Sequence, residues 1–465
     1  MKLSSIKLYS YLSLLFAVQF LSAGAQTDTL NAHMQSVVPA SMMNMSQLLP
    51  EEGMVQPLST GAPVISYGAA RTFAVNEQIN WSPTNSGDAA TFSVTVEQTL
   101  LSGYYNSLNT ASAADGSLYI TNTGYHSILK RTAAGVQTVF AGGNSTVYGY
   151  VNGTGTAARF RHPSFLAIDA SGNIFVADQQ NHRIRKITPS GVVTVFAGSG
   201  SIGSANGTGT AASFHYPMGL AFDGSGNLYV ADAYNHRIRK ITPAGVVSTY
   251  AGSGTAGLLD GTLSTARFNY PIGLSFDGNG ELYVADRSNF AIRKISGNNV
   301  TTVAGNGTAG NIDGLGSAAR FHANNLVVDK SNIYFVDQTY SGLKHISPSG
   351  YVTTISTGGQ FTNPFGISRT PDGKYHITEN TSHRIKKVNI QAAYSISPAL
   401  PSGLTFDHST GKISGKLSAV TASQSYTVTA RNTSGTATSI LTFSVGGSSG
   451  GANFGSSDQN YILET

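Results

Sequence analysis

The residues best suited to chemistry recur just before an apolar segment, at several repeated points of the chain. Arginine, histidine, tyrosine and asparagine lie within or just after variants of the sequence Gly-Thr-Ala-Ala-Arg-Phe, and a proline often follows. Such side chains bind small or peptidic ligands when they converge around a concave mouth. The ten candidate ligand-binding residues, called the predicted collar, are Arg159, His162, His215, Tyr216, Arg267, Asn269, Tyr270, Arg320, His322 and Asn363. The recurrent phenylalanines beside them, such as Phe160, are most simply wedges packed between structural units.

Two groups of histidines raise the question of a metal site, because imidazole is a common zinc ligand. The first group recurs once per repeat, which spreads it around the molecule and favours a turn hydrogen bond: His126, His182, His236 and His383. The second group lies in the predicted collar and could converge on one ion: His162, His215 and His322. The favoured prediction is that the chain binds neither a metal nor a cofactor.

The recurrent charged residues are predicted to be structural. The acids Asp178, Asp232, Asp286 and Asp337 each follow a strand and are expected to cap their own turns. The basic stretches 183–186, 237–240 and 293–294 are expected to form a solvated face. Because the chain lacks a G-x-S-x-G elbow, an H-E-x-x-H helix, a P-loop and a dinucleotide fingerprint, no catalytic residue is assigned.

The elements that must position these residues come from six copies of one repeat. The copies begin at residues 107, 163, 217, 271, 324 and 364, and each predicts four short strands joined by Gly-containing turns. A single four-stranded sheet cannot bury both of its faces, so the copies must pack against one another. The sequence therefore predicts an all-β fold with a six-bladed β-propeller, with a solenoid of stacked sheets as the competing architecture.

One strand is out of place in this pattern. The sixth copy ends near residue 390 without a fourth strand, whereas the segment 93–103 precedes the first copy without partners of its own. We expect residues 93–103 to close the ring by joining the sixth sheet.

The repeated core Asn-His-Arg-Ile-Arg-Lys-Ile, with Val-Ala-Asp before it, resembles the NHL repeat. The resemblance implies a six-bladed propeller but not one function, since such propellers include an amidating lyase, sensors, adhesion modules and RNA binders. The lyase members hold a central metal with histidines and also need a catalytic arginine and tyrosine.

Residues 394–445 resemble the latter part of a bacterial immunoglobulin-like domain of the cadherin-like sort, and residues 62–87 resemble its opening. We therefore expect the propeller to be inserted into a split immunoglobulin-like β-sandwich. The predicted organisation is a signal peptide (1–25), an extended leader (26–61), the first part of the sandwich (62–92), the propeller (93–390, with its closing strand at 93–103), the second part of the sandwich (391–446) and a Gly/Ser-rich linker and tail (447–465).

Composition bounds the function. Only 11% of the residues are charged, the net charge is +5 and there is no cysteine, so neither nucleic-acid binding nor disulfides are expected. Cleavage of the signal peptide would leave no transmembrane segment and place the protein outside the cell. The predicted function is non-catalytic recognition of an extracellular glycan, peptide or protein. One alternative is a metal-dependent propeller enzyme, a lyase or lactone hydrolase, and another is an adhesive or structural spacer whose mouth is plugged by Phe and Tyr.

Overall fold

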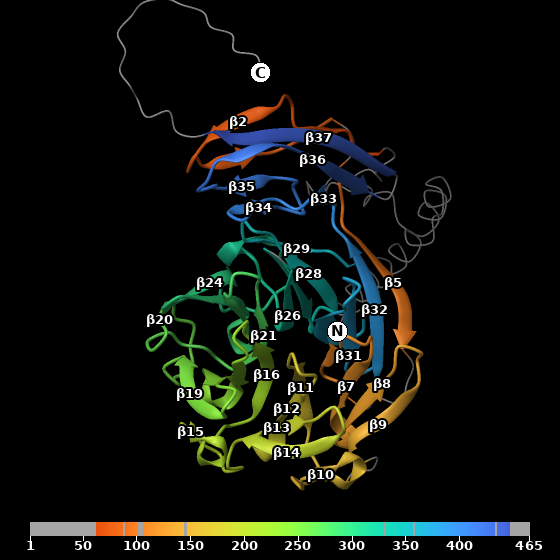
Figure 1. Cartoon of the computed structure of the whole chain (residues 1–465), viewed down its shortest axis with the longest axis vertical. Helices are drawn as coiled ribbons and strands as arrows, with labels where there is room; N and C mark the ends of the chain where they lie inside the picture. Colours follow the sequence, from red (N-terminus) through yellow and green to blue (C-terminus); the bar gives the residue numbers. More distant parts are fainter. Residues whose placement is uncertain are drawn as a thin grey trace, which may run out of the picture. The chain divides into compact units, whose positions relative to one another are not determined.

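The computed structural model describes residues 62–86, 89–100, 106–143, 147–329, 331–356, 359–432 and 435–446. The predicted signal peptide (1–25), the leader (26–61) and the linker and tail (447–465) lie outside the described residues. Strands and short 3₁₀ turns make up the regular structure of the described part (Figure 1). No helix in that part is long and apolar enough to cross a membrane.

Six antiparallel sheets follow the six sequence repeats, and each strand pairs with the next. Repeat 1 contains β6 (Thr110–Ser112), β7 (Leu118–Asn122), β8 (Ser127–Arg131) and β9 (Gln137–Gly142). Repeat 2 contains β11 (Pro163–Ile168), β12 (Ile174–Asp178), β13 (Arg183–Ile187) and β14 (Val192–Ala197). Repeat 3 contains β16 (Pro217–Phe222), β17 (Leu228–Asp232), β18 (Arg237–Ile241) and β19 (Val246–Ala251).

Repeats 4 to 6 continue the pattern. Repeat 4 contains β21 (Pro271–Phe276), β22 (Leu282–Asp286), β23 (Ala291–Ser296) and β24 (Asn299–Gly305). Repeat 5 contains β26 (Ala323–Asp329), β27 (Asn332–Asp337), β28 (Gly342–Ile346) and β29 (Tyr351–Thr354). Repeat 6 contains β30 (Pro364–Arg369), β31 (Tyr375–Glu379) and β32 (Arg384–Gln391).

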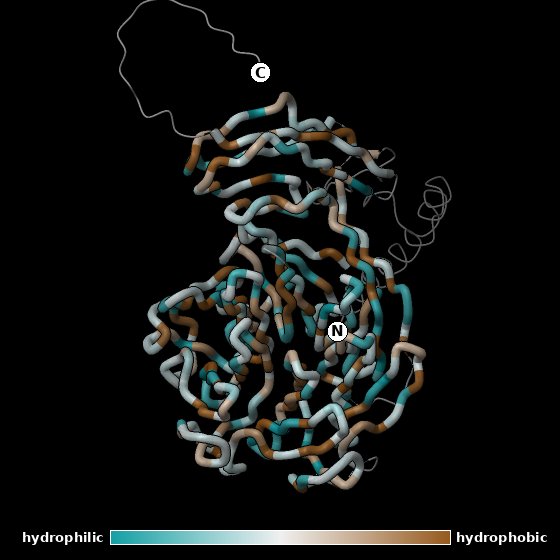
Figure 2. The backbone as a smooth tube through the Cα atoms, viewed as in Figure 1, coloured by the Kyte–Doolittle hydropathy of each residue, from teal (hydrophilic) through white to brown (hydrophobic). Residues whose placement is uncertain are grey.

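The first strands of the repeats contact one another in a closed order. They run β6, β11, β16, β21, β26 and β30, and β30 contacts β6 again. Apolar residues on both faces of each sheet are buried, such as Val230 and Ala231 of β17, because neighbouring sheets cover both faces. Figure 2 shows hydrophobic stretches alternating with hydrophilic ones along the tube. The predicted six-bladed propeller is confirmed.

The sixth sheet takes its fourth strand from far upstream. Strand β5 (Ser93–Leu100) pairs antiparallel with β32, with Val94 opposite Ile390 and Leu100 opposite Ile385. The segments before and after the propeller therefore run side by side, as Figure 1 shows for β5 and β32.

Four sheets carry a short fifth strand that the sequence did not predict. Each consists of two residues of the connection from the preceding repeat, and each pairs with the outer, fourth strand. These strands are β10 (Gly153–Thr154), β15 (Gly207–Thr208), β20 (Gly261–Thr262) and β25 (Gly314–Leu315). They cover outer edges that would otherwise present unpaired backbone groups.

Short 3₁₀ turns lie between the strands. Four follow the second strand of a repeat: η3 (Thr123–Tyr125), η5 (Gln179–Asn181), η7 (Ala233–Asn235) and η8 (Arg287–Asn289). Three lie in the connections between repeats: η4 (Gly155–Ala157), η6 (Gly209–Ala211) and η9 (Gly316–Ala318).

The turns of the first set lie at one end of the propeller, which we call the collar face. There the second strand ends, the third begins and the first is entered, as the pairings of Asp178 with Pro163 and with Arg183 show.

The immunoglobulin-like sandwich is built from both ends of the described chain. One sheet is ordered β2 (Arg71–Ala74), β37 (Gly435–Gly446), β36 (Thr421–Asn432) and β33 (Tyr394–Ser397). The others are β3 (Ile79–Trp81), β35 (Ile413–Gly415) and β34 (Leu404–Phe406), and the pair β1 (Ile65–Ser66) and β4 (Thr84–Asn85). The core holds Trp81 edge-on to Phe73 and Phe443. Strands that precede the propeller thus pair with strands that follow it.

Candidate functional site

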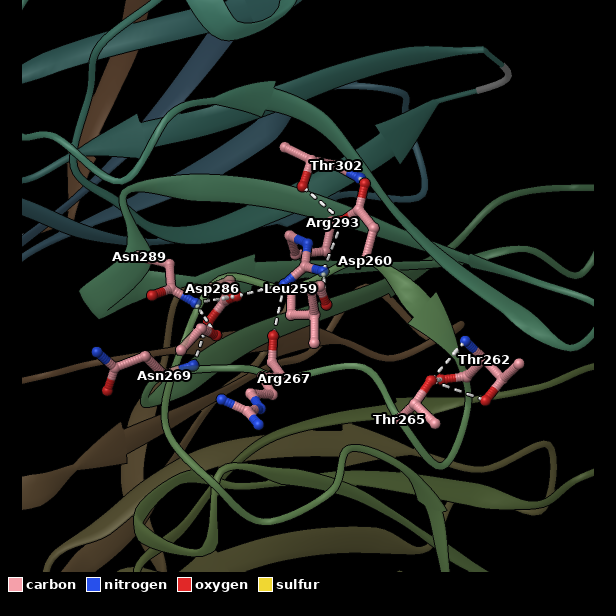
Figure 3. Close-up of polar contacts among 11 residues, drawn as sticks. Leu259, Asp260, Thr262, Thr265, Arg267, Asn269, Asp286, Asn289, Arg293 and Thr302 are labelled. Atoms are coloured by element: carbon pink, nitrogen blue, oxygen red, sulfur yellow. Dashed lines mark hydrogen bonds and ion pairs between the residues drawn. The ribbon is translucent and has the colours of Figure 1, made fainter.

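A buried arginine organises each of the connections that enter repeats 2 to 4. In repeat 4 the Arg293 guanidinium donates to the Asp286 carboxylate over 2.9 Å and to the carbonyl of Arg267 over 2.8 Å (Figure 3). It also donates to the carbonyl of Leu259 over 2.9 Å and to the Asp260 carboxylate over 2.8 Å. The side chains of Arg293 and Asp286 are fully buried, so these bonds form out of water. Arg293 therefore holds the connection 257–268 against its own sheet.

The same arrangement recurs in the neighbouring repeats. Arg185 pairs with Asp178 over 3.0 Å, and Arg239 pairs with Asp232 over 2.9 Å, all with fully buried side chains. Each guanidinium lies over the phenylalanine of its connection: Arg185 over Phe160, Arg239 over Phe214 and Arg293 over Phe268. Repeats 5 and 6 replace the arginine with Lys344, paired with Asp313, and with Lys386, paired with Glu379. The expectation of a solvated basic face is wrong for Arg185, Arg239 and Arg293, which are fully buried.

The buried aspartates mainly position the connection that enters their own repeat. One carboxylate oxygen of Asp232 accepts the backbone N–H of His215 over 2.8 Å, and one of Asp286 accepts that of Asn269 over 2.7 Å. Their other oxygens accept the side-chain amides of Asn235 and Asn289 in the turns that follow, without capping a backbone N–H there. The predicted cap is present at Asp337, which accepts the N–H of Tyr340 in its own turn over 3.1 Å.

The repeated histidines join adjacent repeats. The Nδ1 atom of His182 accepts the backbone N–H of Tyr216 over 3.3 Å, and that of His236 accepts the N–H of Tyr270 over 3.1 Å. His126 accepts from His162 in the same way over 3.1 Å. The expected histidine hydrogen bond is therefore present, although it joins two repeats rather than closing one turn. Burial, with neighbouring histidine or arginine charges, lowers the pKa of His126, His182 and His236.

Four residues of the predicted collar adopt left-handed backbone conformations. Each directly precedes a proline, and their φ angles lie between 50° and 55°: His162, Tyr216, Tyr270 and Asn363. Such a φ is uncommon for tyrosine, so the surrounding hydrogen bonds must hold it.

Aromatic side chains form a continuous cluster across repeats 2 to 4. This aromatic belt consists of His182, His215, Tyr216, Tyr234 and Tyr270. The ring centroids of Tyr234 lie 4.9 Å from His215, 5.0 Å from Tyr216 and 5.0 Å from Tyr270. Tyr234 is 49% exposed, and burial raises the pKa of Tyr270. The belt offers aromatic faces and phenol hydroxyls to solvent.

Polar side chains continue the belt across repeats 4 to 6. This polar arc consists of Arg287, Asn324, Gln338 and Asn363. Arg287 Nε donates to Asn324 Oδ1 over 2.8 Å, Asn324 Nδ2 donates to Gln338 Oε1 over 2.7 Å, and Gln338 Nε2 donates to Asn363 Oδ1 over 2.8 Å. The Arg287 guanidinium carbon lies 5.9 Å from the Tyr270 ring centroid, which joins the arc to the belt.

The structure brings some predicted collar residues together and separates others. His215, Tyr216 and Tyr270 share the belt, and Asn363 ends the arc. His162 lies against His126, and His322 lies against Phe290, with burial and the Arg287 guanidinium lowering the pKa of His322 to about 4.

The remaining predicted residues lie outside the belt and the arc. Arg159 donates hydrogen bonds to carbonyls of its own turn. The exposed side chains of Arg267 and Arg320 lie next to Gly257 and Gly310, respectively. Asn269 is half-buried beside Asp286.

Sequence reasoning missed Tyr234, Arg287, Asn324 and Gln338. Three of them lie directly after the second strand, where the copies read Gln-Gln, Ala-Tyr, Arg-Ser and Gln-Thr between otherwise repeated residues. The variation of these residues inside a repeated turn could have indicated them. Residues that the fold requires recur in every copy, whereas residues that contact a ligand can differ between copies.

The propeller axis is filled. Apolar side chains of the first strands form one buried cluster there that includes Leu108, Phe165, Met218, Ile272 and Phe365. The rings of Phe165 and Phe365, from repeats that are not adjacent, lie 6.3 Å apart. The belt and the arc therefore lie on the surface of the collar face rather than along a central channel.

No group of three His, Asp or Glu side chains within the described residues could hold a metal ion. The three collar histidines each pack against an aromatic ring of the preceding repeat instead of converging.

Comparison with known families identifies the repeat. The family model described as NHL repeat matches residues 160–187, 214–241 and 268–295. The chain carries NHL repeats. The model described as Putative Ig domain matches residues 353–446. That range includes β30 to β32, which pair within the propeller, while partners of the matched strands β35 and β37 come from residues before the propeller.

Curated relatives match part of the chain. The chain is 32% identical over 190 residues to Protein SUPPRESSOR OF QUENCHING 1, chloroplastic, of Arabidopsis thaliana. This match covers 38% of this chain and 18% of that protein. It is 35% identical over 151 residues to NHL repeat-containing protein 2 of Bos taurus, covering 29% of this chain and 21% of the relative. The match thus spans about a fifth of each relative.

Solved structures with similar folds include an auxiliary nutrient binding protein from Bacteroides ovatus, with a TM-score of 0.48 and 14% identity over 67% of this chain and 83% of that one. A streptogramin B lyase gives a TM-score of 0.44 and 14% identity over 66% and 100%. Similarity at this level assigns no activity.

Proposed function

We propose that this chain is an exported recognition protein whose NHL propeller binds an extracellular ligand through the aromatic belt and the polar arc. The proposal includes the signal peptide at 1–25 and the domain boundaries given above. The split immunoglobulin-like domain would serve as the base from which the propeller is presented.

The observation that carries the proposal is the continuity of the belt and the arc. Side chains from repeats 2 to 6 touch in sequence on one face, and their exposed member Tyr234 contacts three other belt residues. Maintaining this face requires left-handed backbone at Tyr216 and Tyr270, which costs of order 1–3 kcal/mol per residue. A face assembled at that cost, and composed of aromatic and amide groups, is suited to binding.

The filled axis bears on the alternatives. A spacer is expected to have apolar side chains at the axis and no linked polar groups around them. Here the apolar cluster at the axis is accompanied by the hydrogen-bonded side chains of the polar arc. The observations therefore favour recognition at the surface over the spacer.

The proposal is tested by screening the mature protein against immobilised glycans and peptides. We expect binding to a restricted set, reduced at least about tenfold by Tyr234→Ala, because removal of an exposed aromatic contact residue commonly costs more than 1 kcal/mol of binding energy. Tyr351→Ala is the control, since Tyr351 lies on β29 away from the belt and is similarly exposed at 46%. Equal binding by the two variants would overturn the assignment of the belt.

A further inference from the structure

Arginines without acidic partners gather on the collar face. In the described part of the chain, eight arginines at this end form no ion pair: Arg159, Arg161, Arg183, Arg237, Arg267, Arg287, Arg320 and Arg384. Arg183 and Arg237 donate instead to the carbonyls of Ser199 and Ser253.

The acids on the same face are already engaged. Asp178, Asp232 and Asp286 are fully buried against arginines. Asp260 and Asp313 bind Arg293 and Lys344. Asp337 is buried and accepts backbone N–H groups from His322 and Tyr340. The charge that this face presents to solvent is therefore positive.

The opposite face differs. Its turns carry aspartates such as Asp169, Asp223 and Asp277, and several of its lysines are paired, including Lys294 with Glu281 and Lys387 with Asp372. The positive charge is thus specific to the end that carries the belt, and it would attract an anionic ligand to that end.

Arg287 is placed to bind such a ligand directly. Its Nε atom is held by Asn324, and no hydrogen bond to a described residue engages its two terminal nitrogens. Burial lowers the pKa of Arg287, which means that its cation has lost part of its hydration. A carboxylate can accept both terminal N–H groups in a bidentate bond.

We propose that the collar face binds an acidic saccharide, with a sugar ring packed on Tyr234 and Tyr270 and its carboxylate held by Arg287. This inference rests on the proposed function and names its ligand class. A sugar ring presents both an apolar face, which an exposed tyrosine can cover, and hydroxyls, which the half-buried amides of Gln338 and Asn363 can bind. An acidic peptide would satisfy the arginines but has no rigid ring to use the tyrosines.

Isothermal titration of the full mature chain with three probes tests the inference: tetragalacturonate, its methyl ester and tetraglutamate. The ester keeps the rings without the charge, and the peptide keeps the charge without the rings. We expect tetragalacturonate to bind at least about tenfold more tightly than either, because each of the other probes lacks one of the two groups that the site would contact, the carboxylate or the ring. Binding should weaken with added salt.

Arg287→Gln should weaken tetragalacturonate binding about tenfold, and Arg287→Lys by less, since lysine keeps the charge but not the bidentate geometry. Arg131→Gln, at the opposite end of β8, is the control, and thermal unfolding of each variant reports that it folds.

Three outcomes would overturn the inference. If the methyl ester binds as tightly as tetragalacturonate, the carboxylate has no role in binding. If tetraglutamate binds as tightly, the ligand need not be a saccharide. If none of the probes binds, the ligand class is wrong, whereas a Tyr234-dependent ligand in the glycan and peptide screen would still support recognition.

Discussion

At the level of single residues, the positions of the belt and the arc depend on side chains that never reach the surface. Arg239 connects the Asp232 carboxylate to the carbonyls of Ser213 and Ala205 and to the Asn206 amide. Asp232 in turn fixes the N–H of His215. The belt residue His215 is thus positioned by the buried ion pair between Asp232 and Arg239.

Replacing this arginine should be costly. Arg239→Met leaves the Asp232 charge buried without its partner, and we expect the free energy of unfolding to fall by roughly 3–5 kcal/mol. Urea denaturation measures the loss. Arg237→Met, two residues earlier on the same strand and half-buried, should change stability by less than about 1 kcal/mol. Similar losses in both variants would contradict the central role of the buried pair.

The histidine contacts predict a dependence on pH. His126, His182 and His236 accept hydrogen bonds at Nδ1 and have lowered pKa values, so the folded state binds their protons less readily than the unfolded state does. Their contribution to stability is complete above the unfolded pKa of about 6.5 and is lost as the pH falls below it. We expect the free energy of unfolding to decrease from pH 7 toward pH 4.5.

The triple variant His126→Asn, His182→Asn and His236→Asn isolates this effect, since asparagine tolerates the left-handed backbone of these positions. Its urea-denaturation midpoint should depend less steeply on pH than that of the parent chain. A parallel pH profile in the two proteins would assign the acid sensitivity to other groups.

At the level of elements, the first strands of the propeller approach one another so closely that side chains are excluded. A Cβ on Gly219 of β16 would collide with the carbonyl oxygen of Ile272 in β21. Gly219→Ala should therefore destabilise the propeller by at least about 1–3 kcal/mol, the usual cost of overpacking. Gly224→Ala, in the turn after the same strand, meets no atom within 4 Å and should be nearly neutral by thermal unfolding. A neutral Gly219→Ala would show that the ring can widen.

The sequence predicted the strands and the number of repeats, because several motifs recur in register around each turn. It did not predict the burial of Arg185. In a strand that is covered on both faces, the alternation of polar and apolar residues no longer indicates which side chains face solvent. The short strand β10 was also missed, because a Gly-Thr pair carries no hydrophobic signal. The repeat pattern does not mark Tyr234 and Arg287, because candidate contact residues vary between repeats whereas residues that the fold requires recur.

At the level of the whole molecule, one strand pairing connects the two ends of the propeller. Thr95 of β5 lies opposite Asn389 of β32, and the chain contains no cysteine. A Thr95→Cys and Asn389→Cys variant should form an intramolecular disulfide under mild oxidation, because directly opposed residues are close enough to be bridged. Counting free thiols measures it. The pair Thr95→Cys and Gln391→Cys, out of register, should remain reduced; equal oxidation of both pairs would contradict the register.

Ligand binding at the collar face is tested most directly by the footprint of bound tetragalacturonate in hydrogen–deuterium exchange. We expect slower exchange in the turns η7 and η8 and in the connections around Tyr216 and Tyr270, all on the collar face. Slower exchange confined to the turns after β11, β16 and β21 on the opposite face, or to the immunoglobulin-like sandwich, would contradict it.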